Sequence, residues 1–303
     1  MGRLFYFFPM KRSLALACLL FSFVYVRAQT VLKVQFDMAV GYEQQKLDWS
    51  IAGNSQGQNP NIYSELKWKK LGGIALSAGA QWNITGRFML MGSYSHSAIS
   101  AGTVTDNDYS SDNRTNRVYN ETFDADQGFS RSVAGGLGFI LIDNNRFGLV
   151  PYVGYGTSKQ SLHLLDRSGQ FADLNSSYQT NWKGPFVKLA AVAKLLSRLS
   201  LKADFRYNQA DYNAKADWNL ISTFQHPVSF RHTAKGYGLE GNTSLAYQLV
   251  KRFAINLGAG VYHWETGKGI DELYLSSGTA EQTQLNSVNR SGYRLFAGVI
   301  FKY

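Results

Sequence analysis

The stretch LSLKADFRYN, residues 199–208, decides the fold class of this 303-residue chain. Apolar and polar residues alternate through it, and the polar positions include Lys202, Asp204 and Arg206 in the middle of the run. A period of two predicts a β-strand with one apolar and one polar face. A soluble β-sandwich would explain the alternation, but charges at mid-strand fit better in the polar lumen of a membrane barrel whose apolar face meets lipid.

The same alternation recurs along the chain, for example in the final stretch at 293–303. The segment FVKLAAVAKLLSRLSLKADF has the composition of a helix. Two strands with a turn at Ser197-Arg198 explain it better, because Lys188 and Lys194 then share one face. After the N-terminal segment no run of about 18 uncharged apolar residues occurs, which excludes transmembrane helices.

Short and long connections alternate between the predicted strands, as expected for periplasmic turns and outer loops. The sequence divides into ten strands, at 31–43, 61–82, 87–98, 119–142, 146–163, 179–196, 199–213, 231–249, 252–265 and 289–303. Long polar connections lie near 44–60, 100–118, 165–178, 214–230 and 266–288. We therefore predict an all-β, ten-stranded antiparallel transmembrane β-barrel in the bacterial outer membrane, with short periplasmic turns and five long outer loops facing the outside.

The N-terminus has the three parts of a secretory signal. Lys11 and Arg12 form a basic start, an apolar run too short to span a membrane follows, and VRA at 26–28 suits a cleavage site. We expect a signal peptide at 1–28 and a single barrel domain at 29–303.

Both Met1 and Met10 are consistent with this signal as the start of the protein. Cys18 would leave with the signal, so the barrel is expected to have no disulfide. Removing the basic residues of the signal lowers the formal net charge from +10 to +6; they are Arg3, Lys11, Arg12 and Arg27. This excess favours anionic lipid surfaces as partners. Nucleic acid is not expected, because no basic run is interleaved with aromatic residues.

Several stretches, in order, resemble the omptins, a family of outer-membrane endopeptidases of Gram-negative bacteria. They include SELKWKK at 64–70, DNDY at 106–109, FGLVPYVGYGTSK at 147–159, VSFRHTAK at 228–235 and GYRLFAGVIFKY at 292–303. The likeness covers nearly all of the chain after the signal, and it depends on order and spacing more than on any single motif. It implies an active site at the outer mouth of the barrel.

In omptins an Asp-x-Asp pair faces an Asp-x-His pair, and the His activates water for peptide hydrolysis. The resemblance implies that Asp106 and Asp108 form the first pair and that Asp217 and Asn219 occupy the second. Asn219 stands where the family has its His, and a side-chain amide cannot take a proton near neutral pH. Loss of a general base is expected to lower the rate roughly 100- to 10,000-fold.

Two histidines, His226 and His232, are close enough in sequence to supply the missing base. The resemblance places Lys215 in the substrate pocket, at a position that is acidic in omptins, so their preference for basic peptides is not expected here. The histidines are scattered, which predicts no metal site.

Omptins require lipopolysaccharide, and Tyr155 and Lys159 match two positions of their binding site. Thr157 replaces the acidic residue between them, and Asn181 stands where the family has Arg. The resemblance thus implies lipopolysaccharide binding that is weaker or different, and no other cofactor.

Two function classes remain open. The first is a surface endopeptidase, impaired or altered, acting on peptide or protein substrates. The second is a non-catalytic omptin-like barrel that serves as an adhesin, a receptor or a structural protein. A small pore is the weaker alternative, because charged side chains line a narrow lumen. We expect a monomer in either class.

Overall fold

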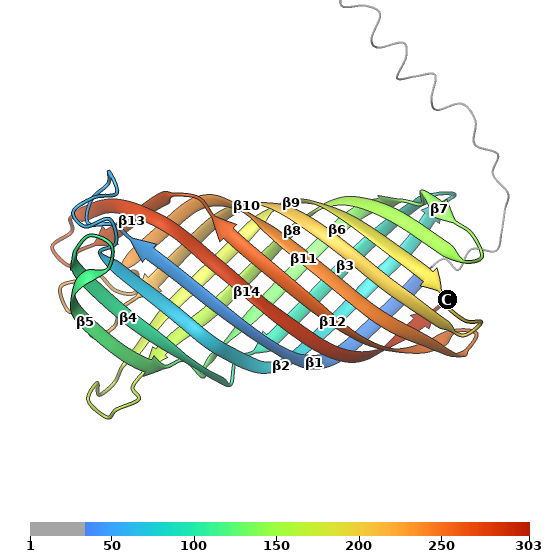
Figure 1. Cartoon of the computed structure of the whole chain (residues 1–303), viewed down its shortest axis with the longest axis horizontal. Helices are drawn as coiled ribbons and strands as arrows, with labels where there is room; N and C mark the ends of the chain where they lie inside the picture. Colours follow the sequence, from blue (N-terminus) through green and yellow to red (C-terminus); the bar gives the residue numbers. More distant parts are fainter. Residues whose placement is uncertain (1–33) are drawn as a thin grey trace, which may run out of the picture. The chain divides into compact units, whose positions relative to one another are not determined.

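The computed structural model describes residues 34–303, so the predicted signal peptide, Met10 and Cys18 lie outside the described residues. In this range fourteen β-strands form a single antiparallel sheet. They are β1 (Val34–Ile51), β2 (Ser64–Thr85), β3 (Phe88–Ala98), β4 (Ala101–Ser111), β5 (Thr115–Asp124), β6 (Gly128–Phe139), β7 (Ile142–Asp143), β8 (Phe147–Leu165), β9 (Asn175–Lys194), β10 (Leu199–Asp217), β11 (Phe230–Val250), β12 (Phe253–Thr266), β13 (Gly269–Tyr274) and β14 (Ala280–Lys302). The sheet closes into a barrel where β1 pairs with β14 (Figure 1).

The fourteen strands occupy ten positions around the barrel, because some of them continue one another. β3 and β4 both pair with β2, and β12 and β13 both pair with β11 and β14. β5 and β6 likewise follow one another alongside β4 and β3. The all-β antiparallel barrel predicted from the sequence is confirmed, including the break between β9 and β10 at residues 195–198.

Much of the polar sequence expected to form loops is strand instead. The clearest case is 100–118, which forms the β4–β5 hairpin with a turn at residues 112–114. The connections at this end, here called the loop end, are 52–63, 112–114, 166–174, 218–229 and 275–279. Strand pairing continues past the apolar part of the barrel because it satisfies the backbone polar groups whatever the side chains are.

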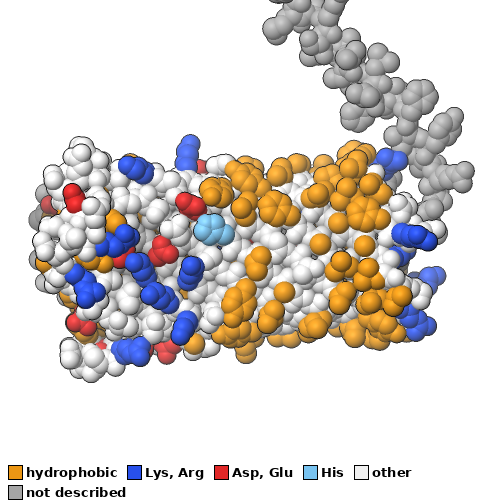
Figure 2. Space-filling model, viewed as in Figure 1, with side chains coloured by type: hydrophobic (Ala, Val, Ile, Leu, Met, Phe, Trp, Pro, Cys, Tyr) orange, Lys and Arg blue, Asp and Glu red, His pale blue; other side chains and the backbone are white. Residues whose placement is uncertain are grey.

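The opposite end, here called the turn end, has short connections and holds both ends of the described chain. The backbone N–H of Val34 donates to the carbonyl of Tyr303 at 3.1 Å. Beside the turn end, outward apolar side chains form a band around the visible face, and charged side chains cover the surface toward the loop end (Figure 2). Phe36, Met38 and Leu295 are examples of exposed residues in this band. No helix in residues 34–303 is long and apolar enough to cross a membrane.

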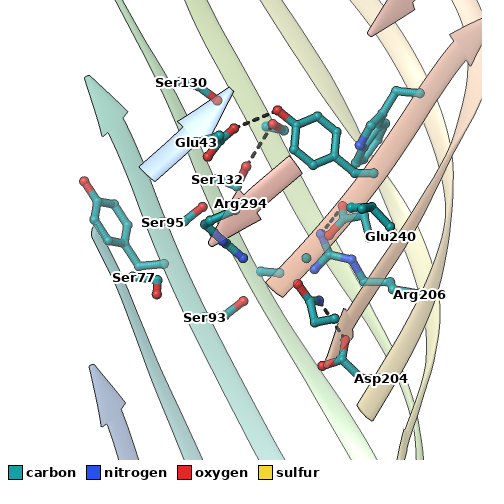
Figure 3. Close-up of a pocket in the computed structure, with 18 of the residues that line it drawn as sticks. Glu43, Ser77, Ser93, Ser95, Ser130, Ser132, Asp204, Arg206, Glu240 and Arg294 are labelled. Atoms are coloured by element: carbon teal, nitrogen blue, oxygen red, sulfur yellow. Dashed lines mark hydrogen bonds and ion pairs between the residues drawn. The ribbon is translucent and has the colours of Figure 1, made fainter. Parts of the chain in front are cut away.

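Inside the barrel, at the level of the apolar band, the lumen is polar. Lys188 Nζ lies 3.2 Å from Asp204 Oδ1, and Arg206 pairs with Glu240 on the neighbouring strand. Their side chains face a shared interior hollow (Figure 3). This arrangement confirms the interpretation of residues 199–208, whose alternate charges face the lumen and whose apolar residues face outward.

Toward the loop end the lumen is filled by an aromatic core. Trp68, Tyr178, Trp182 and Tyr212 are among its largest side chains, and all are fully buried or nearly so. Trp68 stacks on Tyr178 with ring centroids 5.4 Å apart, although β2 and β9 are not neighbours in the sheet. Side chains from opposite walls therefore meet across the lumen and form the base of the site described next.

Candidate ligand site at the loop end

A cavity of about 420 Å³ lies at the loop end, above the aromatic core. Its lining is largely apolar and comprises Trp49, Ile51, Leu66, Phe123, Leu164, Phe171, Leu174, Trp218, Leu220, Ile221, Phe224, Phe230 and Leu273. The ionisable residues in the wall are Tyr63, Asp106, Asp108, Tyr119, His232 and Asp271. An apolar cavity with a few convergent polar groups is the usual form of a small-molecule site.

Asp106 and Asp108 enter this cavity through strand alternation. Both lie on β4, one residue apart, and residues at i and i+2 of a strand share a face. In the adjacent β2 they pair with Leu66 and Ser64, which also line the cavity. The structure therefore brings the predicted Asp pair together at the mouth of the barrel.

Asp106 carries a buried carboxyl oxygen in this wall. Its Oδ1 is buried and has no hydrogen-bond partner within residues 34–303. Burial, and secondarily the negative charge of Asp108, raise the pKa of Asp106 to about 8. Burial also raises the pKa of Asp108, against a hydrogen bond from Ser64.

His232 lies in another part of the same wall and is completely buried. Its Nδ1 is 2.8 Å from the hydroxyl of Tyr178, which is itself 2.6 Å from that of Tyr212. Its Nε2 lies 3.2 Å from Asp271 Oδ1, an ion-pair distance without hydrogen-bond alignment. Sequence reasoning did not find this pair, because the two residues meet only through the pairing of β11 with β13.

The predicted second pair does not line the cavity. Along β10 the even-numbered Ala214 and Ala216 point inward and are buried, so Lys215 and Asp217 point to the outer side. Trp218, one residue further, lines the cavity in place of Asp217. Successive side chains of a strand point to opposite faces, so an alignment displaced by one residue assigns a site residue to the wrong face.

Asp217 nevertheless has an imidazole partner. His226 Nδ1 lies 2.6 Å from Asp217 Oδ1, and His226 Nε2 lies 3.3 Å from the carbonyl oxygen of Ile221. Of the two histidines considered as substitutes, His226 therefore reaches Asp217, whereas His232 shares the cavity with Asp106 and Asp108. The structure does not bring His226 and Asp106 into one cavity.

Asn219 joins two connections of the loop end. Its side-chain oxygen accepts hydrogen bonds from Asn175 N and Ser176 Oγ, both at 3.0 Å, and its amide nitrogen donates to the carbonyl of Asp173 at 2.8 Å. These contacts use both ends of the amide. In this structure Asn219 ties segment 218–229 to the start of β9.

The residues matched to lipopolysaccharide binding lie on the outer face of β8. Tyr155 is exposed at the edge of the apolar band. Lys159, two residues beyond Thr157 toward the loop end, is exposed on the same face of the strand. Thr157 donates to Asn181 at 2.8 Å, so two of the substituted family positions contact each other. Lys159 is flanked across the sheet by Arg131.

Glu65 anchors the β4–β5 hairpin on the side of β2 away from the cavity. Lys67 and Arg114 pair with its carboxylate at 2.6 and 2.9 Å, and the Tyr109 hydroxyl donates to it at 3.0 Å. Burial raises the pKa of Glu65, but these hydrogen bonds outweigh burial and hold the pKa below its usual value. The hairpin that carries Asp106 is thus fixed by a charged cluster of its own.

We expect Glu65→Gln to destabilise the barrel by about 2 kcal/mol at pH 7, because the charge-assisted hydrogen bonds to this buried carboxylate are lost. A carboxyl whose folded pKa is depressed stabilises above its unfolded pKa and loses this effect as pH falls through the folded value. The difference from wild type should therefore be smaller at an acidic pH, below the ordinary pKa of a glutamate, than at pH 7. Urea unfolding at both pH values measures it, with the exposed Glu281→Gln as control; equal losses at both pH values would contradict the assignment.

Residues 34–303 contain no group of three or more His, Cys, Asp or Glu side chains placed to hold a metal ion. The ionisable groups that line the cavity are carboxyl, imidazole and phenol groups.

Comparison with solved structures shows the same fold in an outer-membrane protein. Among solved structures, the outer-membrane protease OmpT from Escherichia coli superimposes with a TM-score of 0.72 at 12% identity, covering 89% of this chain and 97% of that one. The translocator domain of the autotransporter NalP from Neisseria meningitidis matches at a TM-score of 0.38 and 13% identity, covering 96% and 94% of the two chains. The likeness to OmpT shows the fold alone, and no curated protein matches the chain.

The family model described as "Pom: Protochlamydia outer membrane protein" matches residues 37–297, which is nearly the entire barrel. The chain therefore belongs to this family of outer-membrane proteins, and it is a β-barrel of the bacterial outer membrane.

Proposed function

We propose that this protein is an outer-membrane receptor whose loop-end cavity binds a ligand with an apolar body and a hydrogen-bond donor. One observation carries the proposal: within residues 34–303, Asp106 Oδ1 is buried without a hydrogen-bond partner in the wall of a largely apolar cavity of about 420 Å³. A buried polar atom left without a hydrogen bond costs about 1–3 kcal/mol, and a ligand that supplies the missing donor recovers this energy. The apolar lining adds affinity in proportion to the ligand surface that it removes from water.

The proposal includes an orientation of the barrel in the membrane. We expect the loop end to face the outside of the cell, because the apolar band lies beside the turn end and charged outer surfaces follow it toward the loops. The cavity would then be open to ligands arriving from the medium. Protease cleavage of connection 218–229 on intact cells would support this orientation, and cleavage only after lysis would contradict it.

A cavity-filling substitution tests the binding site. Ser176 is buried and lines the cavity, whereas its neighbour Ser177 lies on the outer side of β9. Ser176→Phe is expected to lower the affinity for N-phenyl-1-naphthylamine, an apolar probe with one N–H donor, at least tenfold; Ser177→Phe should leave it unchanged. Energy transfer from Trp49 and Trp218 to the probe in nanodiscs measures binding, with empty nanodiscs as blank. Equal affinity in both variants would place the probe outside the cavity and contradict the proposal.

Peptide hydrolysis is a second candidate function, and a specific arrangement favours it. Asp106 and Asp108 share one cavity wall with the His232–Asp271 pair, so three carboxyls and an imidazole surround one space. Against this role, both ring nitrogens of His232 already face internal partners. The test is to incubate the refolded barrel with a mixed peptide library in the presence of lipopolysaccharide. Cleavage that Asp106→Asn abolishes would support hydrolysis. Absence of cleavage would leave ligand binding as the only proposed function of the cavity.

Lipopolysaccharide is the lipid partner that we propose for the outer surface. Tyr155 is positioned to contact acyl chains, and Lys159 with Arg131 is positioned to contact phosphates at the edge of the apolar band. Lys159→Glu should reduce the thermal stabilisation produced by lipopolysaccharide. Lys268→Glu, in the β12–β13 connection, is the control and should not reduce it.

A further inference from the structure

A second, polar hollow lies within the lumen, on the turn-end side of the aromatic core. Its volume is about 150 Å³, and its wall carries the serine hydroxyls of Ser77, Ser93, Ser95, Ser130, Ser132 and Ser158 together with charged side chains (Figure 3). It is separate from the loop-end cavity, with which it shares no lining residue. Nothing in the proposed receptor function uses it.

Most charged groups around this hollow already have partners. Lys188 pairs with Asp204, and Arg206 pairs with Glu240. Arg290 donates from both terminal nitrogens, to Ser158 and Ser130, each at 2.8 Å. Arg290, on β14, therefore reaches across the lumen to β6 and β8, which are not its neighbours in the sheet.

Arg294 is the cation without such contacts. Within residues 34–303 its guanidinium makes no hydrogen bond and no ion pair within 4.0 Å, and its Nε is buried without a partner. Its neighbour on β1, Glu43, accepts a hydrogen bond from the Tyr262 hydroxyl at 2.7 Å. A guanidinium has five N–H donors, and a buried donor without an acceptor is costly.

Three hydroxyls facing the same hollow also lack a hydrogen-bond partner within residues 34–303. Ser77 on β2 and Ser93 and Ser95 on β3 form no hydrogen bond within the described part of the chain, and β2 and β3 are adjacent in the sheet. Register pairing places Ser77 directly opposite Ser95. Arg294 and these serines therefore present unused donors to one space (Figure 3).

The formal charges around the hollow also leave an excess of one positive charge. Lys188, Arg206, Arg290 and Arg294 are the cations, and Glu43, Asp204 and Glu240 are the anions. Two cations and two anions neutralise one another in the pairs already named. A small anion would offset this excess and accept the free hydrogen bonds at the same time.

We propose that the lumen hollow binds one tetrahedral oxyanion of the phosphate or sulfate class, held by the Arg294 guanidinium and by the hydroxyls of Ser77, Ser93 and Ser95. Arginine is suited to this role because its planar fork donates two parallel hydrogen bonds to an oxyanion. Serine hydroxyls rotate to donate to the remaining oxygens. The hollow has room for such an anion with a few water molecules.

Selenate, a sulfate analogue with an anomalous X-ray signal, is the probe for this site. The full barrel is refolded and crystallised with selenate present, so that access through the closed lumen does not limit binding, and affinity in solution is measured by calorimetry. The expected result is one anomalous peak beside Arg294, with an affinity that Arg294→Gln lowers at least tenfold and Ser95→Ala lowers a few-fold. Lys302→Gln removes a cation from the turn end of the barrel, outside the hollow, and should leave the affinity unchanged.

Retention of the folded electrophoretic mobility shows that each variant forms the barrel. If Arg294→Gln fails to fold, the wild-type anomalous map and Ser95→Ala still decide the question. Ordered water alone in the hollow, a selenate peak elsewhere, or equal affinity of wild type and Arg294→Gln would overturn the proposal. A peak seen in crystals without calorimetric binding would identify an adventitious ion only and would also overturn it.

Discussion

Asp106→Asn is expected to reduce strongly the loss of barrel stability as the pH rises from 4 to 9. The carboxyl pKa rises from 3.8 to about 8 in the folded protein, so the folded state favours the neutral acid. Stability from this group is fully present below the unfolded pKa and is lost as pH rises through the folded pKa. Since each pKa unit corresponds to about 1.4 kcal/mol, the wild type loses on the order of 5 kcal/mol by pH 9, and the amide variant does not.

Urea unfolding in lipid vesicles at several pH values measures this effect. Asp108→Asn is the matched control, because Asp108 lies on the same strand face and keeps a hydrogen bond from Ser64. Its variant should change the pH profile much less. Parallel pH profiles for wild type and Asp106→Asn would show that Asp106 is solvated, and would remove the basis for the receptor proposal.

Trp68→Ala is expected to destabilise the barrel by about 3–5 kcal/mol, the usual cost of removing a large buried aromatic side chain. Trp68 is completely buried, stacks on Tyr178 and donates from Nε1 to the carbonyl of His163 at 3.3 Å. These contacts link β2 with β8 and β9 across the lumen. The deletion leaves a void in the aromatic core, so we also expect a larger single-channel conductance than in wild type.

Trp82→Ala is the control for this deletion. Trp82 lies on β2 as well, but it is exposed on the outer face within the apolar band. Its removal should change stability less and conductance not at all. An unchanged conductance in Trp68→Ala would show that the aromatic core does not obstruct the lumen, although the stability loss would still measure packing.

The strand pattern was predictable because it depends on local alternation. Residues 199–208 show a period of two with charges on one face, and this alone identifies the lumen-facing positions of β10. The extent of the strands at the loop end was not predictable in the same way. Residues 100–118 are polar and contain turn-forming residues, and only their pairing with β2 and with each other makes them a hairpin.

The candidate site was predictable in part. Asp106 and Asp108 share a strand face, so their joint position follows once the strand is known. The face of β10 on which Asp217 lies changes with a shift of one residue in the alignment. In the structure Asp217 points to the outer side, where its carboxylate contacts His226. The His232–Asp271 pair joins residues distant in sequence, and no local pattern marks it.

The central claim is that the Asp106 carboxyl recognises a ligand inside an apolar cavity, and a crystal structure of the barrel with N-phenyl-1-naphthylamine tests it most directly. We expect the probe within the loop-end cavity, its rings among Trp49, Phe230 and Trp218 and its N–H within hydrogen-bond distance of Asp106 Oδ1. Ordered water around Asp106, with the probe bound only to the outer face, would contradict the claim.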